Sequence, residues 1–389
     1  MKRSDVAIVG GGLIGAWAAF FLRRRGRSAV LVEKGVVGAH ASGVNYGNLR
    51  LQGRHPAEFP LALRAHALWE QIETLIGERC ELNRCGHLYI GFGFQDEERL
   101  VRYAREAHAA GLEVEPLGAN EVQRRWPWLG GDVSTALWSH RDATANPRLV
   151  TPAVARAAVA LGAELLEHAR VTRIERAGDG FRVETTRGVA VESPFVINAA
   201  GAWGNEIAKM FGEEAKMFAA APPHFVTEPV PYFIAPSVQA VDGSVIFRQI
   251  DRGNVIAGFY PRGRADIVTE RAPVPPEKLL LGMERLARIV PDLAGSQVLR
   301  VWSGVEAYVA DMLPVIGPSR TAEGLIHAYG FCGHGFQLSP GVGMSLAELV
   351  VDGQAAVPIA PFSIARFGPG FRADEERLAG EFDPGIRSQ

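Results

Sequence analysis

The chain has 389 residues, of which 47% are hydrophobic and 22% charged, and its formal net charge is only −2. These values are those of an ordinary globular protein with room for two domains. A nearly neutral chain without a long run of lysine or arginine does not predict a nucleic-acid partner. Cys80, Cys85 and Cys332 form neither a disulfide framework nor a set of zinc ligands, so we expect free thiols and no metal.

The sequence also lacks the pattern of a membrane anchor. Its first apolar stretch is broken by glycine after four residues, and the uncharged stretch 325–346 contains two histidines, a proline and several glycines. Neither stretch is typical of a signal peptide or a transmembrane helix. We therefore expect a cytoplasmic protein, with peripheral attachment to the inner membrane left open.

The first predicted elements are a strand, a helix and a second strand. Residues 6–9 are an apolar run typical of a buried parallel strand, and 13–25 show the apolar spacing of a helix. A second apolar strand is predicted at 29–32. The letters GGGLIG stand between the first strand and the helix, and this arrangement is the signature of a dinucleotide-binding βαβ unit.

Each glycine of that turn has a physical role. Gly10 permits the tight turn, Gly12 lets the backbone approach a pyrophosphate, and Gly15 lets the helix pack closely on the strand. The phosphates would face the positive end of the helix dipole. Glu33, at the end of the second strand, is placed to accept hydrogen bonds from ribose hydroxyls. This spacing alone does not choose between NAD and FAD.

The later elements follow from apolar period, glycine and proline. A strand at 195–198 leads into a turn of small residues, 199–201, which again suits a close approach of the backbone to a cofactor. A hairpin is expected around 251–253. Ser339 and Pro340 are predicted to be the N-cap and the first residue of a helix. Further helices are predicted at 60–76, 96–110, 120–126, 147–161 and 275–289, and a further strand at 86–94.

Five segments, in this order, carry a resemblance to a known family: GGGLIGAWAAFFLRRRGRSAVLVEKG, AHASGVNYGNLRLQGRHP, VINAAGAW, WSGVEAYVADMLPVIGPS and GFCGHGFQLSPGVG. They resemble the FAD-dependent D-amino-acid oxidase family, which includes glycine oxidase, sarcosine oxidase and amino-acid dehydrogenases. The resemblance extends from Val6 to about Gly353. Within the family, the second and fifth segments look most like the branch of the B-type subunits of opine oxidase and of hydroxyproline dehydrogenase.

The resemblance implies an α/β fold with two domains, each assembled from separate stretches. A Rossmann-like FAD-binding domain with a parallel sheet is expected to comprise 1–79, 145–221 and 320–365. A substrate domain of the α+β type, on an antiparallel sheet, is expected to comprise 80–144 and 222–319. Residues 366–389 would form a C-terminal tail.

The βαβ signature and the resemblance together imply FAD and its contacts. Cys332 does not match the motif through which some sarcosine oxidases attach the flavin, so we expect noncovalent FAD. In the family, the loop that corresponds to 333–337 borders the isoalloxazine ring. The expected contacts are Gly10, Gly12, Leu13, Ile14, Gly15, Glu33, Lys34, Ala41, Ser42, Gly43, Asn45, Asn48, Leu49, Val171, Ala199, Ala200, Gly201, Trp203, Gly304, Gly333, His334, Gly335, Phe336 and Gln337.

Substrate recognition departs from the better-known family members at one position. Glycine oxidase and several dehydrogenases carry an arginine in a W-x-G-x-R stretch that binds the substrate carboxylate, whereas this chain has Glu306 there. Because a carboxylate prefers a cation, either Arg50 or Arg248 replaces that arginine, or the substrate presents an amine or guanidinium. His334 and Tyr260 complete the expected catalytic residues.

The expected reaction is FAD-dependent oxidation of the C–N bond of an amino acid, an imino acid or an opine-like secondary amine. Hydride transfer to flavin N5 would give an imine. Two other functions stay open: an NAD-linked Rossmann dehydrogenase, which the late flavin-like loop opposes, and a flavin-binding subunit with a structural or electron-relay role in a larger complex. Oxygen, a quinone and a partner subunit are each compatible electron acceptors.

Overall fold

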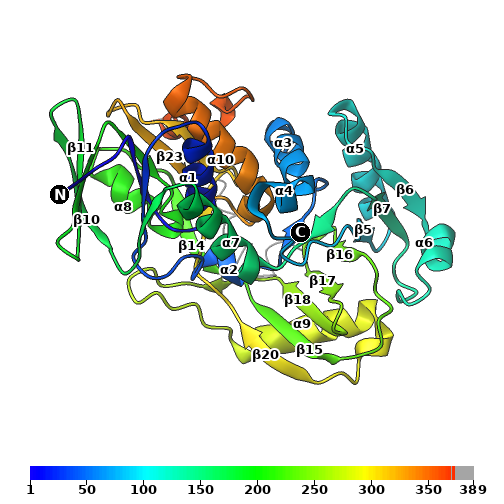
Figure 1. Ribbon diagram of the computed structural model, residues 1–389. Helices are drawn as coiled ribbons and strands as arrows, with labels where there is room; N and C mark the ends of the chain where they lie inside the picture. The colour runs from blue at the N-terminus through cyan, green and yellow to red at the C-terminus, as the bar shows by residue number, and fades with distance from the viewer. Residues whose placement is uncertain (369, 373–389) are drawn as a thin grey trace.

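A computed structural model describes residues 1–368 and 370–372, so the expected tail at 366–389 lies mostly outside the described residues (Figure 1). Among these residues, one sheet has six strands in the order β22-β23-β13-β2-β3-β9, with β22 antiparallel to its neighbour and the other pairs parallel. Its central strands are continuous apolar runs because both faces of the sheet are covered. The strands are β2 (Val6–Val9), β3 (Ala29–Val32), β9 (Glu164–Leu166), β13 (Phe195–Asn198), β22 (Val315–Pro318) and β23 (Leu325–Tyr329).

Helices cover this sheet through unusually close contacts. Helix α1 (Leu13–Arg24) packs against α7 (Pro147–Ala160) and α10 (Gly335–Val351), and α10 also packs against α3 (Phe59–Glu70). Figure 1 draws α1 in dark blue beside α10 in orange. A Cβ at Gly343 would lie 2.4 Å from Cβ of Trp17, so glycine is required where α10 crosses α1.

Helix α10 begins earlier than the sequence indicates. The prediction of Ser339 as N-cap and Pro340 as first residue is wrong, because the helix begins at Gly335 and Pro340 lies inside it. A proline here removes the N–H that would bind the carbonyl of Phe336. The hydroxyl of Ser339 donates to that carbonyl instead, at 2.8 Å. The N-terminus of α10 therefore lies at His334, inside the glycine–histidine–glycine loop.

The second large sheet, among the described residues, has eight strands in the order β20-β15-β18-β17-β16-β5-β7-β6, and β16 and β5 are a parallel pair within it. Helix α9 (Pro276–Ile289) packs on β17 and β18 below the sheet in Figure 1. The hairpin predicted at 251–253 is confirmed as the turn between β17 and β18. The strands are β5 (His87–Gly91), β6 (Glu115–Gly118), β7 (Thr135–Ser139), β15 (His224–Pro229), β16 (Ser237–Ala240), β17 (Val245–Gln249), β18 (Asn254–Phe259) and β20 (Val298–Trp302).

Smaller sheets and helices complete the fold. A further sheet has the order β1-β12-β11-β10, another has the order β19-β14-β21, and β4 pairs with β8. These strands are β1 (Lys2–Arg3), β4 (Asn48–Leu49), β8 (Ala143–Thr144), β10 (Val171–Ala177), β11 (Gly180–Thr185), β12 (Ala190–Ser193), β14 (Met217–Ala221), β19 (Gly263–Arg264) and β21 (Glu306–Val309). The remaining α-helices are α2 (Ala41–Val44), α4 (Ile72–Ile76), α5 (Phe94–Ala109), α6 (Ala119–Arg125) and α8 (Gly204–Lys209).

The predicted fold class is confirmed: a parallel sheet carries the βαβ unit, and a largely antiparallel sheet forms the second half. The helix expected at 60–76 is divided into α3 and α4 at Gln71. The Gln71 N–H donates to the carbonyl of Leu68, three residues back, and this tightens the end of α3.

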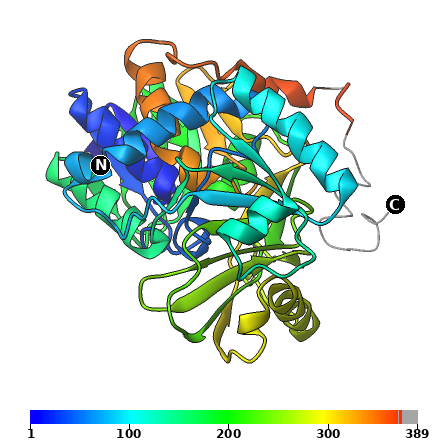
Figure 2. The ribbon, with the colours of Figure 1, turned by 90° about the vertical axis from the view of Figure 1, so that its right-hand side faces the viewer.

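Strand membership supports the predicted division into two domains, which we keep as a proposal. Every strand of the eight-stranded sheet comes from 80–144 or 222–319, and in Figure 2 these yellow-green strands and α9 lie below the blue and orange elements around the first sheet. Strand β22 also falls within 222–319 but belongs to the six-stranded sheet. The boundary near 320 is therefore better placed before β22.

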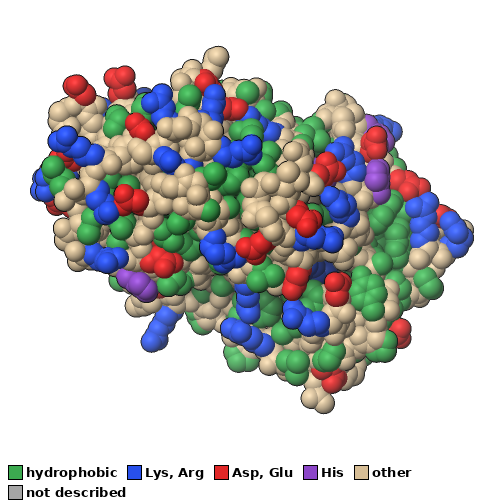
Figure 3. Space-filling view, in the orientation of Figure 1, with side chains coloured by type: hydrophobic (Ala, Val, Ile, Leu, Met, Phe, Trp, Pro, Cys, Tyr) green, Lys and Arg blue, Asp and Glu red, His purple; other side chains and the backbone are tan. Residues whose placement is uncertain are grey.

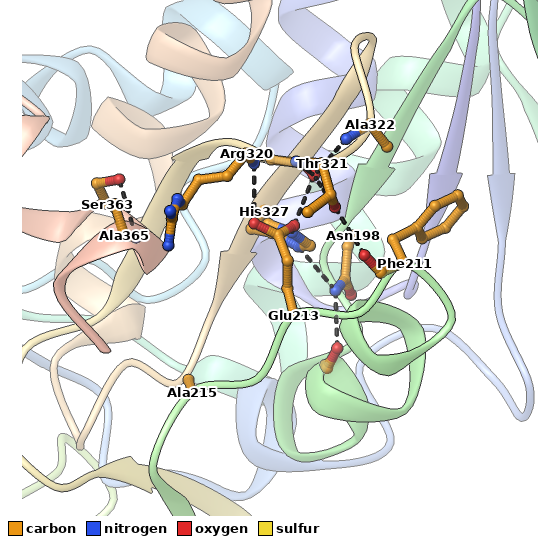
Figure 4. Close-up of polar contacts among 12 residues, drawn as sticks. Asn198, Phe211, Glu213, Ala215, Arg320, Thr321, Ala322, His327, Ser363 and Ala365 are labelled. Atoms are coloured by element: carbon orange, nitrogen blue, oxygen red, sulfur yellow. Dashed lines mark hydrogen bonds and ion pairs between the residues drawn. The ribbon is translucent and has the colours of Figure 1, made fainter. Parts of the chain in front are cut away.

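A buried polar network ties the first sheet to the segment that follows α8 (Figure 4). His327 on β23 donates from Nε2 to Oε2 of Glu213 at 3.0 Å, and its Nδ1 accepts from Nδ2 of Asn198 on β13 at 3.2 Å. The same carboxylate accepts the Ser319 hydroxyl at 2.5 Å and the Arg320 N–H at 2.8 Å. Each polar atom in this network therefore has a partner inside the fold.

The surface in view is mixed in charge. Figure 3 shows basic and acidic side chains interspersed across this face of the protein. Among the described residues, none of the helices combines the length and the apolar character that crossing a membrane requires.

Candidate functional site

A cavity of about 960 Å³ is lined by residues at the carboxyl ends of the parallel strands and by residues of the antiparallel sheet. Val9 and Val32 end β2 and β3, whereas Ile246 and Gly258 come from β17 and β18. Its volume is at the upper end of the roughly 300–1,000 Å³ found for small-molecule sites. A ligand in the crevice beyond the strand ends of a parallel sheet is the usual arrangement in such folds.

The structure brings most of the predicted residues together in this cavity. They come from segments as far apart in sequence as the glycine-rich turn and the loop before α10. The predicted cofactor residues that line it are Gly10, Gly12, Leu13, Ile14, Glu33, Lys34, Ala41, Ser42, Asn45, Asn48, Val171, Ala199, Ala200, Gly201, Trp203, Gly304, Gly333, His334, Gly335 and Phe336. The predicted catalytic residues that line it are His334, Arg50, Tyr260 and Glu306.

Some predicted cofactor residues do not line the cavity and have packing roles instead. A Cβ at Gly15 would lie 2.1 Å from the carbonyl oxygen of Gly10, so this glycine allows α1 to approach β2. Gln337 is almost fully buried, and its Nε2 donates to the carbonyl of Ala62 on α3 at 2.9 Å. The residues in this group are Gly15, Gly43, Leu49 and Gln337.

Arg248, one of the two candidates for a carboxylate clamp, is not part of the cavity lining. Its side chain lies on the same face of β17 as Ile246, which does line the cavity, but two residues farther along the strand. There its Nη2 donates to the carbonyl of Ala145 at 3.3 Å, and its guanidinium lies 5.5 Å from the ring centroid of Tyr46. Arg248 is therefore buried behind the loop that carries Tyr46.

The glycine-rich turn has the geometry that a diphosphate site requires. Gly10 has φ +111°, and a Cβ there would lie 2.3 Å from the carbonyl oxygen of Ala199. A Cβ at Gly12 would lie 3.0 Å from the hydroxyl of Ser42, which accepts the N–H of Leu13 at the start of α1. Any side chain at these positions would fill the space beside the N-terminus of α1, where an anion is stabilised.

Other polar groups around the turn also fit a nucleotide. Glu33 is buried at the end of β3, where its two carboxylate oxygens accept the N–H groups of Gly11 and Gly35, each at 2.7 Å. The carboxylate is thus fixed in place with lone pairs left over for hydroxyl donors. Within the described part of the chain, both polar atoms of the Asn48 side chain lack a hydrogen-bond partner. Such a buried amide on a cavity wall fits a polar ligand.

One wall of the nucleotide end is supported by a segment that sequence reasoning did not identify. The Nζ atom of Lys34 lies 3.1 Å from the ring centroid of Trp203 and 2.5 Å from Oε1 of Glu270. Nε1 of Trp203 donates to the carbonyl of Ile267 at 3.0 Å. Burial lowers the pKa of Lys34, against the opposing pull of Glu270. The segment 265–271 therefore holds both Lys34 and Trp203 in place.

At the other end of the cavity, His334 is held between an acid and a base. Its Nδ1 lies 2.9 Å from both carboxylate oxygens of Glu58, and its Nε2 lies 3.2 Å from Nη2 of Arg50. A guanidinium has only donors, so Nε2 must accept and the proton must be on Nδ1. His334 is therefore a neutral imidazole whose Nδ1–H donates to Glu58.

The charges around His334 agree with this tautomer. Burial lowers the pKa of His334, although Glu58 opposes the change. Burial acts to raise the pKa of Glu58, but the contact with His334 and the charges of Arg54 and Arg50 outweigh it and hold that pKa at about 2. Glu58 is therefore ionised. The pKa of buried Arg54 falls to about 10 because of desolvation, so it stays charged at neutral pH.

A second polar cluster lies on the opposite strand system of the cavity. Nε of Arg262 donates to the Tyr308 hydroxyl at 2.8 Å, and this hydroxyl donates to Oε2 of Glu306 at 2.8 Å. The guanidinium carbon of Arg262 lies 4.4 Å from the ring centroid of Tyr308 and 5.6 Å from that of Tyr260. All four residues line the cavity. Its wall therefore carries a positive and a negative group side by side.

Glu58 and Arg262 are the functional residues that sequence reasoning missed. Glu58 contacts a histidine 276 positions later in the chain, and Arg262 contacts a tyrosine 46 positions later. Neither residue stands in a motif or in a segment that resembled the family. The signal available in the sequence was indirect, since Glu306 in place of an arginine required a cation from elsewhere.

Comparisons with known proteins agree with this site. A family model for the FAD-dependent oxidoreductases called DAO matches residues 5–349. The glycine oxidase of Geobacillus kaustophilus is 28% identical over 373 residues, which are 94% of this chain and 97% of that protein. The beta subunit of the sarcosine oxidase of Rhizobium meliloti is 27% identical over 391 residues, which are 96% and 90% of the two chains.

Solved structures show the same relationship. The L-proline dehydrogenase of P. horikoshii matches with a TM-score of 0.88 and 25% identity, covering 94% of this chain and 98% of its own. The glycine oxidase of Geobacillus kaustophilus matches with a TM-score of 0.86 and 27% identity, covering 94% and 99%. The expected family and cofactor are confirmed. The chain belongs to the DAO family of FAD-dependent oxidoreductases.

Proposed function

We propose that the protein oxidises the C–N bond of an amino acid, an imino acid or an opine-like secondary amine. The observation that carries this proposal is the continuity of one cavity from the glycine-rich turn to the clusters around His334 and Glu306. The relatives described above are named for glycine, sarcosine or L-proline, and each of these compounds combines an amine with a carboxylate. The opine oxidase and hydroxyproline dehydrogenase branch stays a prediction.

In this proposal the nucleotide end of the cavity holds the adenosine diphosphate part of FAD. The turn at Gly10 and Gly12 and the N-terminus of α1 receive the diphosphate, and Glu33 receives the ribose hydroxyls. Val171 lies where the resemblance places the adenine. FAD, when bound, accepts a hydride at N5 from the carbon next to the substrate nitrogen, which leaves an imine. Cys332 is buried, and we retain noncovalent attachment.

The N-terminus of α10 is the proposed electrostatic partner of the flavin ring. Because α10 begins at Gly335, the N–H groups of its first turn have no acceptor within the helix and point toward the loop that borders the cavity. Negative charge that develops on the ring system would be stabilised there by the helix dipole. The neutral His334 at the N-cap adds no competing charge.

A second candidate function is a flavin-binding subunit within a larger complex. It is favoured because two relatives are themselves subunits, the beta subunit of sarcosine oxidase and the hydrogen cyanide synthase subunit HcnC of Pseudomonas aeruginosa, which is 26% identical. This candidate is compatible with amine oxidation by the same chain. It differs in the electron acceptor, which would then be a partner subunit or a quinone.

An anaerobic substrate screen tests the proposal. Purified protein with bound FAD is mixed, without oxygen, with sarcosine, glycine, L- and D-proline, hydroxyproline and representative opines, and the flavin absorbance is followed. We expect at least one of these amines to bleach the oxidised flavin within seconds to minutes. A flavin that stays oxidised with every amine would contradict the proposed activity and favour the subunit role. Admission of oxygen afterwards shows whether oxygen is an efficient acceptor.

A further inference from the structure

The pair of Arg262 and Glu306 is the feature of the cavity that the family resemblance does not explain. Glu306 and Tyr308 are two residues apart on β21, so both side chains project from the same face of that strand. Arg262 directly precedes β19, and β19 and β21 flank β14 in one sheet. The strand order thus places a base from one edge beside an acid from the other.

The remaining acidic side chains of the cavity have other tasks. Glu33 accepts two backbone N–H groups at the nucleotide end, and Glu206 lies 3.5 Å from Arg170 there. Asp242 is exposed and accepts the N–H of Ser244 in its own turn. Among the described residues that line the cavity, Glu306 is the acid next to the loop that borders the proposed flavin ring, and the backbone of Gly333 contacts it.

We propose that Arg262 and Glu306 together bind the head group of an α-amino acid, with Arg262 on the carboxylate and Glu306 on the ammonium group, and that Glu306 takes the ammonium proton before oxidation. This inference rests on the proposed function of amine oxidation. An α-amino acid carries both charges on one carbon, so it matches a cation and an anion that share one tyrosine hydroxyl. The aromatic rings on either side keep the guanidinium in place.

The proton transfer is balanced without a further reactant. One N–H bond of the ammonium group breaks, the proton forms an O–H bond on the Glu306 carboxylate, and the nitrogen keeps the electron pair. That pair is needed because it becomes part of the C=N bond when the hydride leaves the neighbouring carbon. The step itself oxidises and reduces nothing.

The surroundings of Glu306 suit a proton acceptor. Burial raises the pKa of Glu306, while the hydrogen bond from Tyr308 and the charge of Arg262 limit the increase. The other titratable groups that face it are the Tyr308 hydroxyl and the Cys332 thiol, and burial raises the pKa of both. Both therefore stay protonated at neutral pH. Glu306 is left as the group of this cluster that can accept a proton.

A matched pair of ligands tests the binding part of the inference. α-Aminoisobutyrate and α-hydroxyisobutyrate share the same carboxylate and branched carbon and differ in an ammonium against a hydroxyl group. Neither has a hydrogen on the α-carbon, so the flavin cannot oxidise them there. Isothermal titration of the oxidised holoprotein should show that the amino acid binds about 10-fold or more tightly than the hydroxy acid, as expected for a hydrogen bond between charged groups.

Three variants separate the two contacts. Glu306→Gln should remove the preference for the amino acid and leave the affinity for the hydroxy acid as in the wild type. Glu306→Asp keeps the charge and should keep the preference. Arg262→Met should weaken both ligands by a similar factor, about 10- to 100-fold, because both carry the carboxylate. Retained flavin absorbance shows that each variant is folded. A preference that survives in Glu306→Gln, or an Arg262→Met variant that weakens neither ligand, would overturn the inference.

The proton-transfer part has its own readout. The anaerobic rate of flavin bleaching, measured against pH with the fastest amine from the screen, should fall at low pH in the wild type as Glu306 becomes protonated. Glu306→Gln should lack this acid limb, and the same limb in both proteins would contradict the assignment. The proposed function fails in a different way. A flavin that no amine bleaches, together with a preference that depends on Glu306, would refute the oxidation and uphold the binding site.

Discussion

Two buried histidine–glutamate pairs lie in different parts of the molecule and have different surroundings. His327 binds Glu213 at 3.0 Å and Asn198 at 3.2 Å, and its side chain is completely buried between β13 and β23 (Figure 4). His334 binds Glu58 at 2.9 Å, but its second nitrogen meets Arg50, and one side of its ring faces the cavity. The same two residue types thus occur once in the core and once at the candidate active site.

The comparison teaches that the third partner decides the role of such a pair. An amide beside His327 supplies one more neutral hydrogen bond, and the network is closed. A guanidinium beside His334 fixes the tautomer, keeps the ring neutral and leaves positive charge at the cavity wall. We therefore expect changes in the first pair to alter the stability of the fold, and changes in the second pair to alter the chemistry of the flavin.

The largest effect is expected on breaking the core pair. Glu213→Ala leaves the donors of His327, Ser319 and Arg320 without an acceptor in a buried site, which should lower the free energy of unfolding by about 3–5 kcal/mol. Chemical denaturation measures this loss. The neighbouring Glu214 is exposed and paired with Lys209, so Glu214→Ala is the control and should change stability by less than about 0.5 kcal/mol.

The affinity of the folded Glu213→Ala variant for FAD should equal that of the wild type, because the network does not line the cavity. A variant as stable as the wild type, or one that folds but cannot bind FAD, would break the comparison at its first half.

Glu58→Gln should act mainly on the reaction. The amide still accepts from Nδ1–H of His334, but it no longer carries the charge that balances Arg54 and Arg50. We expect the anaerobic rate of flavin reduction to fall by about 10- to 100-fold, as is typical when a group that orients a functional histidine is removed. Stopped-flow absorbance gives this rate. Glu70→Gln, in the half-exposed pair with His66, is the control and should leave the rate unchanged.

Arg50→Met should release the tautomer of His334. Without the guanidinium donor at 3.2 Å, Nε2 is free to bind a proton, and the loss of a nearby positive charge raises the pKa of the imidazole by about 1 unit. The histidine resonances in an NMR titration report this pKa directly. An imidazole that titrates at the same pH in both proteins, or at a lower pH in the variant, would show that Arg50 does not control its protonation.

Acid should weaken the core pair in a defined pH range. The pKa of Glu213 is held at about 2 in the folded protein, since hydrogen bonds from His327, Ser319 and Arg320 outweigh the effect of burial, against 4.5 for an ordinary glutamate. A lowered folded-state pKa gives stability that is complete above the unfolded value and is lost as the pH falls from about 4.5 toward about 2.

The Glu213→Gln variant should therefore be less stable than the wild type at neutral pH but should lose less stability over that acid range. Urea unfolding at a series of pH values compares the two slopes. Parallel slopes would mean that Glu213 does not titrate with folding.

The local signals of the sequence were enough for the nucleotide half of the site. The strands Val6–Val9, Ala29–Val32 and Phe195–Asn198 were predicted with their observed bounds, because apolar runs and the glycines after them are local features. The start of α10 was predicted wrongly because proline normally marks a first turn. Its tolerance inside the helix depends on the hydroxyl of Ser339, which satisfies a carbonyl of the preceding turn.

The substrate half of the site depends on contacts that no local signal records. Glu58 meets His334 only because η1 (Pro56–Glu58) is folded against the N-terminus of α10. Arg248 and Arg262 are equally basic in the sequence, and only the strand registers bury the first behind Tyr46 and bring the second to Tyr308. Side-chain positions that result from the order of strands in a sheet are therefore beyond the reach of motif analysis.

The midpoint potential of the bound flavin tests the central claim most directly, because it responds to groups beside the ring and not to groups in the remote core. The measurement compares the wild type with His334→Ala and His327→Ala, each with FAD bound. The account predicts that His334→Ala shifts the potential and the flavin absorbance, whereas His327→Ala changes neither and only lowers stability. Equal potentials in the wild type and His334→Ala would contradict the placement of the flavin ring at the His334 loop.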